Sequence, residues 1–297
     1  MKIPPALKKG DTVIIAATAR KTTKEAIAPA VKTLQKWGLK ILYAPNLFRE
    51  KHQFAGTDEE RTKGLQWALD HKKAKAIILA CGGYGTVRII DEIKFKKFVK
   101  HPKWIVGYSD ATVLQSHLFT MGVATIHGTM AFQFSKDKEA TESLKKTLFG
   151  EKVVIKAKQN GLNRSGKAKG EVVGGNLSLL YALAGSKSSV NTKGKILFIE
   201  DLDEYLYHID RMMMQLRRSG KLKNLKALIV GGMSDMKDNT VPFGKTAEQI
   251  IFDAVKDYKY PVCFNFPAGH ITKNMALYIG KKAQLQVDKK GAELIYI

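Results

Sequence analysis

The first 127 residues alternate between short, wholly apolar runs and longer segments that have one apolar face. The apolar runs occupy residues 12–17, 39–43, 76–80, 104–108 and 123–126. Residues 24–37 between the first two runs carry apolar side chains at helical spacing, and Thr57 with Glu60 matches a helix-starting capping box. Strands without polar alternation are buried on both faces, as in a parallel sheet that helices cover. The pattern therefore predicts an α/β fold.

Within this fold class, the N-terminal domain is expected to be a flavodoxin- or Rossmann-like parallel sheet. The pattern changes beyond residue 170, where 195–199 and 227–230 predict strands and 176–184, 205–216 and 246–255 predict helices. Residues 275–297 alternate as strands do. We therefore expect a second, mixed α/β domain. The predicted division is an N-terminal domain over 1–135, a basic connecting segment over 136–170 and a C-terminal domain over 171–297.

The chain is strongly basic. Its 50 Lys and Arg residues against 27 Asp and Glu give a formal net charge of +23 at pH 7. The segment 136–170 is the most charge-dense, and its glycines favour a solvated connection. A nucleic-acid site would interleave aromatic and basic residues or show a helix-turn-helix pattern, and neither pattern occurs. We therefore expect no nucleic-acid partner and interpret most lysines as solvated.

Other features bear on where the protein works. No apolar run approaches the roughly 20 residues of a membrane span, and the N-terminus lacks the apolar stretch of a secretory signal. Cys81 and Cys263 are the two cysteines, and they form neither a disulfide framework nor a zinc spacing. We expect a cytoplasmic protein with no membrane association, metal or cofactor.

Ser109 lies on a turn between an apolar strand and a helix, in Gly107-Tyr108-Ser109-Asp110. A serine on such a turn presents its hydroxyl as a nucleophile elbow does. The amide of Asp110, at a helix N-terminus, can face a developing oxyanion. A serine that only caps the helix would give the same pattern, and the residues alone leave both interpretations open.

A glycine loop, Gly82-Gly83-Tyr84-Gly85, follows the strand at 76–80. Its backbone amides can approach a ligand closely, although a tight turn is the alternative interpretation. The spacing matches neither a dinucleotide fingerprint nor a Walker loop. Cys81 precedes the loop and suggests a cysteine nucleophile, but no helix follows it directly.

A nucleophilic serine needs a base, and the base needs an orienting carboxylate. Among the seven histidines, His270 lies in a Pro/Gly loop beyond a strand, where functional residues concentrate, and His127 ends the fifth apolar run. Glu200 is the first polar residue after a buried strand. Asp203 and Glu204 are expected instead to cap the next helix. Spacing alone does not bring Ser109, Glu200 and His270 together.

These stretches, in this order, resemble the LD-carboxypeptidases (muramoyl-tetrapeptide carboxypeptidases), a family that includes the microcin C7 self-immunity proteins. The resemblance runs through nearly the whole chain. The matching stretches are Pro5-Ala6-Leu7 with Gly10-Asp11, Gly56-Thr57-Asp58 with Glu60-Arg61, Gly82-Gly83-Tyr84-Gly85 with Arg88, Gly107-Tyr108-Ser109-Asp110, His127-Gly128, Gly174-Gly175-Asn176-Leu177, Glu200-Asp201 with Asp210-Arg211, and Gly269-His270.

The resemblance implies a two-domain serine peptidase with a Ser–Glu–His triad. Ser109 matches the nucleophile, Glu200 the orienting acid and His270 the general base. The family's oxyanion hole would fall on the amides of Gly83 and Asp110. Three further positions match or adjoin residues of the substrate pocket: Tyr84, His127 and Asn176. The sequence departs from the family at Cys81, where arginine is usual.

The family cleaves the amide between the L-centre of a dibasic residue, meso-diaminopimelate or lysine, and the terminal D-alanine of murein tetrapeptides. The step belongs to cell-wall recycling, and members are commonly homodimers that need no metal. One alternative is an immunity-type hydrolase of acyl-sulfamoyl or acyl-phosphoramide adenylates, for which Tyr205 and Tyr207 offer aromatic faces. An alternative of another class is a non-catalytic nucleic-acid binder driven by the positive charge.

Overall fold

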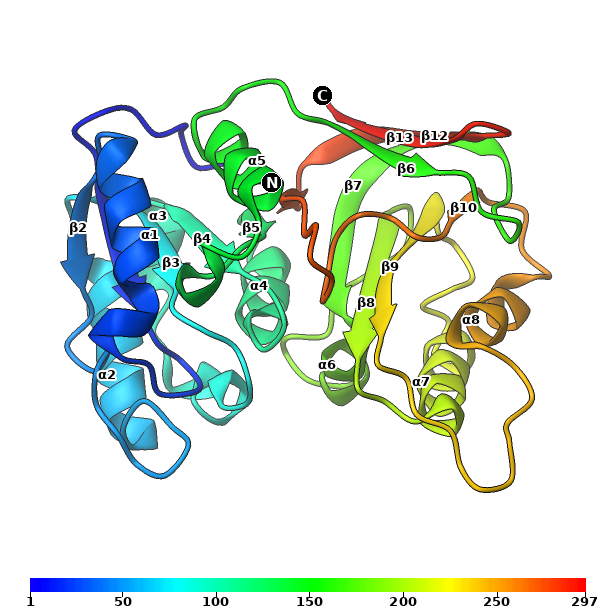
Figure 1. Cartoon of the computed structure of the whole chain (residues 1–297), viewed down its shortest axis with the longest axis horizontal. Coiled ribbons are helices and arrows are strands. Elements are labelled where there is room, and N and C mark those ends of the chain that lie inside the picture. Colours follow the sequence, from blue (N-terminus) through cyan, green and yellow to red (C-terminus); the bar gives the residue numbers. More distant parts are fainter.

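The computed structural model describes residues 1–297 as two sheets with helices around them (Figure 1). The first sheet has the strand order β11-β5-β4-β3-β1-β2, and all its neighbouring pairs are parallel except β11 with β5. Its strands are β1 (Thr12–Ala16), β2 (Lys40–Tyr43), β3 (Ala74–Leu79), β4 (Trp104–Gly107), β5 (Thr125–His127) and β11 (Leu277–Ile279). Its helices are α1 (Lys24–Lys36), α2 (Asp58–Asp70), α3 (Lys96–Lys100), α4 (Ala111–Thr120) and α5 (Lys138–Leu148).

The second sheet is mixed, with the order β10-β9-β8-β7-β12-β13-β6. Its parallel half is β10 (Val262–Cys263), β9 (Ala227–Ser234), β8 (Ile196–Leu202) and β7 (Gly166–Asn176). Its antiparallel half adds β12 (Lys282–Asp288), β13 (Gly291–Tyr296) and β6 (Val154–Lys158). The helices here are α6 (Leu177–Ala182), α7 (Leu206–Arg218) and α8 (Ala247–Val255). The predicted fold class, a parallel-sheet domain followed by a mixed α/β domain, is confirmed.

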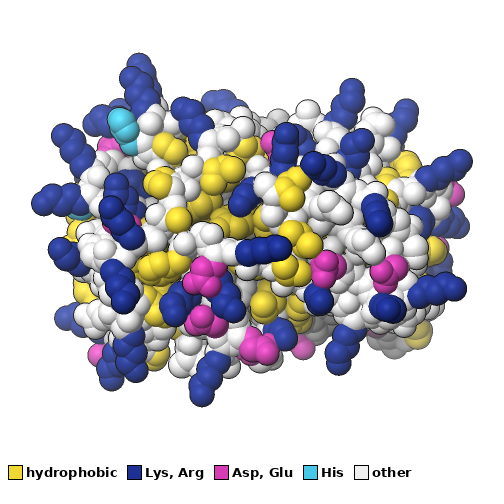
Figure 2. All heavy atoms as spheres, turned by 90° about the horizontal axis from the view of Figure 1, so that it is seen from above, with side chains coloured by type: hydrophobic (Ala, Val, Ile, Leu, Met, Phe, Trp, Pro, Cys, Tyr) yellow, Lys and Arg dark blue, Asp and Glu magenta, His cyan; other side chains and the backbone are white.

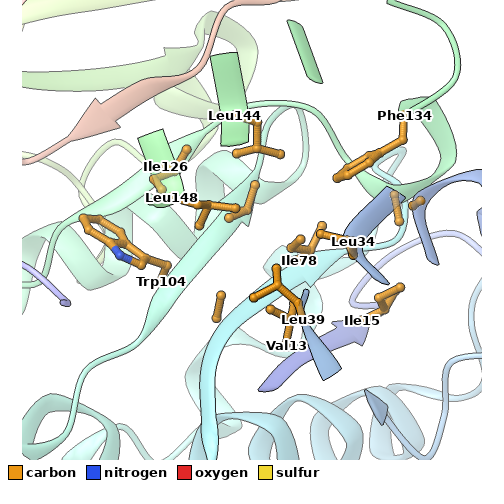
Figure 3. Close-up of a cluster of buried hydrophobic side chains, with 14 of the residues drawn as sticks. Val13, Ile15, Leu34, Leu39, Ile78, Trp104, Ile126, Phe134, Leu144 and Leu148 are labelled. Atoms are coloured by element: carbon orange, nitrogen blue, oxygen red, sulfur yellow. The ribbon is translucent and has the colours of Figure 1, made fainter. Parts of the chain in front are cut away.

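Both faces of the first sheet are largely buried at β1, β3, β4 and β5, which explains their continuous apolar runs, whereas the edge strand β2 is mostly exposed. Val13 and Ile15 of β1 face one core cluster, whereas Ile14 between them faces another. Figure 3 shows the first cluster, in which Leu34 of α1 and Leu144 of α5 lie among the strand residues. Successive side chains of a strand point to opposite faces, so neither face of β1 can be polar.

Residues 136–170 are not the solvated connection that their charge suggested. They form α5, β6 and the start of β7. Ile155, Ala157 and Ala168 point into a core, and the alternating lysines between them are exposed. This is the period-two pattern of a half-buried antiparallel sheet, so the lysines lie on its solvent face. The bounds of the domains themselves stay a prediction.

The C-terminal segment returns to the first sheet. β10 lies in the second sheet and β11 pairs with β5 in the first, so residues 264–276 run between the two lobes (Figure 1). The amide of Gly280, directly after β11, also donates to Val172 of β7 (2.7 Å). The loop that carries His270 is therefore fixed at both ends, each in a different sheet.

The basic residues are distributed rather than gathered on the face that Figure 2 shows. Lys and Arg side chains surround this face, with Asp and Glu among them. No helix combines the length and the apolar character that crossing a membrane requires. No group of three His, Cys, Asp or Glu side chains is placed to hold a metal ion.

Candidate active site

Ser109 lies where β4 turns into α4, in a backbone conformation that few serines adopt. Its φ is +61°, in the left-handed region. The N-cap of α4 is Asp110, and no side-chain hydrogen bond caps the helix, so the Ser109 hydroxyl does not serve as a cap. A strained turn with an uncommitted hydroxyl is the geometry of a nucleophile elbow. The alternative of a helix-capping serine is therefore wrong.

The carboxylate of Asp110 fastens the glycine loop against this turn. It accepts hydrogen bonds from the amides of Gly85 (3.2 Å) and Thr86 (2.9 Å) and from the Thr86 hydroxyl. Burial raises the pKa of Asp110, whereas these donors favour its ionised form. A β-carbon on Gly82 would lie 3.2 Å from Ser109 Oγ, so loop and serine are in close contact. The loop that carries Gly83 is thereby held beside the Asp110 amide.

Glu200 and His270 meet as an acid–base pair. His270 donates from Nδ1 to Glu200 Oε2 at 2.6 Å, and its backbone amide donates to the same oxygen at 3.0 Å. Glu200 is fully buried at the end of β8, and 12% of the His270 side chain is exposed. Burial alone would lower the pKa of His270, but the hydrogen bond and charge of Glu200 and the charge of Asp201 outweigh it, so this pKa is raised. The carboxylate thus fixes one imidazole tautomer, with Nε2 as the acceptor.

Ser109 follows β4 of the first sheet, and His270 comes from the loop that joins the two sheets. The ring of Tyr108 packs on the imidazole of His270, with centroids 4.8 Å apart. The serine is therefore one residue from this contact, although no hydrogen bond joins its hydroxyl to the imidazole. Such catalytic hydrogen bonds are often long without a ligand. The structure brings the three predicted triad residues to the junction of the lobes.

Asn274 links His127 to the loop that carries His270. The Oδ1 atom of Asn274 accepts from the Gly269 amide (2.8 Å) and lies 3.2 Å from His127 Nε2. His127 is fully buried, and burial lowers its pKa to about 4, so it is neutral near pH 7. Asn274 was missed in the sequence because an asparagine in a loop carries no signal of its own. The predicted role of His127 in substrate binding stays a prediction.

The other two predicted pocket residues differ in how they are placed. Tyr84 projects from the glycine loop with 47% of its surface exposed. Asn176 is buried at the end of β7, where its amide group donates to Asp201 Oδ1 (2.8 Å) and its oxygen accepts from the Leu179 amide at the start of α6. Asn176 is thus engaged in capping a helix. Its contact with substrate, like that of Tyr84, stays a prediction.

The acidic residues after Glu200 do not cap the next helix as expected. Asp203 forms an ion pair with Lys237 (2.6 Å), and Glu204 contacts His208 (2.6 Å). The N-cap of α7 is Tyr205, which makes no side-chain capping bond. The prediction failed because the side chains of both carboxylates are engaged elsewhere, Asp203 by Lys237 outside the helix and Glu204 by the side chain of His208 rather than by a backbone amide of the first turn.

Cys81 is not suited to act as a nucleophile. Its thiol donates to the Arg20 carbonyl oxygen (3.1 Å), and burial raises its pKa to about 11. The thiol is therefore protonated near pH 7, and the reactive thiolate is scarce. The cysteine-nucleophile alternative has no support in this environment.

Gly269 allows Glu200 and His270 to approach, and its replacement tests this geometry. Its φ is +108°, and an added β-carbon would lie 2.7 Å from Glu200 Oε2. Gly269→Ala should cost about 1–3 kcal/mol of stability and reduce the expected peptidase activity at least about tenfold, because it displaces the carboxylate. Thermal unfolding and turnover measure the two effects.

Gly185→Ala is the matched control, because Gly185 also has a positive φ (+80°) but nothing lies within 4 Å of an added β-carbon. It should lose some stability and keep its activity. Equal activity in both variants would show that the close approach at Gly269 is unimportant.

Comparisons with known proteins point to one family. The model of the LD-carboxypeptidase N-terminal domain matches residues 13–128, and that of the LD-carboxypeptidase C-terminal domain matches residues 169–285. The probable murein peptide carboxypeptidase of Bacillus subtilis (strain 168) is 35% identical over 97% of this chain and 93% of its own length. The microcin C7 self-immunity protein of Escherichia coli is 23% identical over 97% of this chain and 94% of its own.

Solved structures agree with these matches. The muramoyltetrapeptide carboxypeptidase from Oxalobacter formigenes superimposes with a TM-score of 0.88 at 27% identity, covering 96% of this chain and 98% of that one.

Proposed function

The chain belongs to the LD-carboxypeptidase family, and we propose that it removes the terminal D-alanine of murein tetrapeptides with Ser109 as its nucleophile. Relatives named murein peptide and murein tetrapeptide carboxypeptidase support peptidase activity. The observation that carries the serine mechanism is the hydrogen bond of His270 Nδ1 to the buried Glu200 carboxylate (2.6 Å). Orientation of an imidazole by a buried carboxylate is what a general base in acyl transfer requires.

In the proposed mechanism, His270 Nε2 accepts the hydroxyl proton as Ser109 Oγ attacks the carbonyl carbon before D-alanine. The backbone amides of Gly83 and Asp110 stabilise the oxyanion, and each such donor contributes roughly 2.7–4 kcal/mol in a comparable hydrolase. The tetrahedral intermediate collapses, and the amine of D-alanine leaves with the proton from His270. A water molecule, deprotonated by the same imidazole, then cleaves the acyl-enzyme. Glu200 stabilises the imidazolium in both halves.

The activity should depend on pH through His270. The neutral imidazole is the active base, and the pKa of His270 is raised above its ordinary value because Glu200 outweighs the effect of burial. The ratio kcat/KM should therefore rise with pH through an apparent pKa above about 6.5. A rate profile of D-alanine release between about pH 5 and 9 measures this limb. A profile that is already flat below pH 6 would contradict the assignment of His270 as the base.

A panel of peptides tests the proposed substrate. We expect mass spectrometry to find D-alanine and a tripeptide after incubation with tetrapeptides that end in L-Lys-D-Ala or meso-diaminopimelate-D-Ala, with and without the muramoyl group. The comparison of the two third residues identifies the preferred one. Cleavage of another bond, or no cleavage of any member, would refute the proposed substrate class. Gel filtration in the same series tests the predicted homodimer.

A second candidate function is hydrolysis of acyl-sulfamoyl or acyl-phosphoramide adenylates. Tyr205 and Tyr207, just beyond Glu200, are each 40% exposed, and their rings lie 5.6 Å apart. Arg211 lies over the Tyr207 ring at 5.1 Å, so part of this aromatic surface already has a partner. An exposed aromatic pair can stack on a nucleobase. Faster hydrolysis of an acyl-sulfamoyl adenosine than of any tetrapeptide would favour this candidate.

A further inference from the structure

Arg20 covers the glycine loop beside the proposed oxyanion hole. A β-carbon on Gly83 would lie 2.4 Å from Arg20 Cδ and 3.2 Å from its Nε, so the arginine side chain lies directly over the Gly83 α-carbon. The guanidinium therefore begins within about 6 Å of the Gly83 amide nitrogen, since a β-carbon is roughly 2.5 Å from its own nitrogen. Arg20 is exposed, as is Gly83.

The backbone around Arg20 is held in place from two sides. Its amide donates to Gly82 (3.3 Å), and its carbonyl accepts from the Cys81 thiol (3.1 Å). On the other side, the Lys21 amide donates to the Gln53 carbonyl oxygen (2.9 Å), and the backbone of Arg20 forms an isolated antiparallel β-bridge with that of Phe54. The side chain therefore starts from a fixed point beside the loop rather than from a free surface segment.

Arg20 also differs from its cationic neighbours in having no carboxylate partner. Lys21 pairs with Glu50 at 3.0 Å, whereas Arg61 and Arg88 both pair with Asp58. These three cations lie near the glycine loop: Lys21 follows Arg20 in the chain, Arg61 lies against Gly85, and Arg88 is three residues beyond Gly85. No ion pair within the chain satisfies the Arg20 guanidinium. A planar guanidinium with free donors is suited to bind a carboxylate through two hydrogen bonds.

We propose that Arg20 binds the terminal carboxylate of the peptide and so restricts cleavage to the last bond of the chain. The proposal rests on the proposed carboxypeptidase function. In that reaction the leaving D-alanine carries its carboxylate about 4 Å from the carbonyl carbon that Ser109 attacks. With this carbonyl oxygen at the Gly83 amide, the carboxylate falls within reach of the Arg20 guanidinium. Arg20 is thus a specificity-determining residue, outside the triad.

Two peptides that differ only at the terminus test this role. We compare kcat/KM for L-Ala-γ-D-Glu-L-Lys-D-Ala as the free acid, which releases D-alanine, and as the terminal amide, which releases D-alaninamide. The wild type should prefer the acid by about 10- to 100-fold. Arg20→Gln should abolish the preference by slowing only the acid. Arg20→Lys should keep part of the preference, because lysine retains the positive charge but lacks the planar guanidinium that donates two hydrogen bonds to one carboxylate.

Arg218→Gln is the matched control, because Arg218 is exposed at the end of α7 and its loss changes the net charge equally. It should retain the wild-type preference. An acid preference that persists in Arg20→Gln, or an equal loss on both peptides, would overturn the proposal.

These measurements distinguish an error in the proposed substrate from an error in the proposed role of Arg20. A wild type that releases neither product refutes the tetrapeptide substrate. Calorimetric binding of both peptides to the Ser109→Ala variant, with and without Arg20→Gln, then decides about Arg20. Tighter binding of the acid that disappears with Arg20 supports the proposal, whereas equal binding or none refutes it.

Discussion

Replacing Ser109 with alanine should lower kcat for D-alanine release by about 10⁴- to 10⁶-fold, as the loss of a nucleophile does in a comparable serine hydrolase. The fold should stay intact, because the hydroxyl caps no helix. Alanine also carries a β-carbon, so the left-handed backbone at this position is strained to a similar degree as with serine. Turnover and thermal unfolding of the purified variant measure the two expectations.

Ser116→Ala provides the control for the loss of a hydroxyl from this region. Ser116 lies on α4, and its buried Oγ has no hydrogen-bond partner. Its replacement should leave turnover close to the wild-type value. If the Ser109 variant released D-alanine at a similar rate to the Ser116 variant, the assignment of the nucleophile would be wrong.

Glu200→Gln should have the second largest effect, a decrease of kcat by about 10⁴-fold, as in a related carboxylate-to-amide change. Glu200 Oε2 accepts from both the amide and Nδ1 of His270, so the glutamine side chain can present its NH₂ group to the imidazole and favour the wrong tautomer. The loss of the negative charge also removes the interaction that raises the pKa of His270. If the variant keeps measurable activity, the rise of its rate with pH should therefore occur at lower pH than in the wild type. Rate profiles of both enzymes measure the two changes.

Glu204→Gln is the matched control, because Glu204 contacts His208 at the same distance of 2.6 Å outside the site. This variant should retain the wild-type rate, and its rate should rise with pH over the same range as that of the wild type. If the rate of the Glu200→Gln variant rose with pH over the same range as that of the wild type, His270 would not be the group whose ionisation limits the rate.

Much of this architecture could be predicted from the sequence, because burial leaves a regular pattern. The continuous apolar strands of the first sheet predicted its parallel arrangement, and the Thr57–Glu60 capping box is present at the start of α2. The conformation of residues 136–170 was predicted wrongly because the prediction relied on charge density. The strand signal is the alternation of Ile155 and Ala157 with lysines. Charge density describes the solvent face of such a strand and not its conformation.

The candidate site was predictable at the ends of strands and not beyond them. Ser109 follows β4 and Glu200 lies near the C-terminal end of β8, so their positions could be inferred from the sheets. The contact of Glu200 with His270 depends on a loop that joins two sheets, and no local pattern encodes it. The roles of Asn274 and Arg20 depend on contacts with residues far away in the sequence, which only the folded chain defines.

The most direct test of the central claim is a titration of D-alanine release against covalent labelling by a fluorophosphonate. This reagent phosphonylates an activated serine, and its fluoride leaves as the Oγ–phosphorus bond forms while His270 takes the proton. Peptide mapping by mass spectrometry then counts the label at each residue. The account predicts that activity falls to zero in proportion to the label on Ser109, at one label per chain. Activity that survives full labelling of Ser109, or that is lost with the label at another residue, would contradict it.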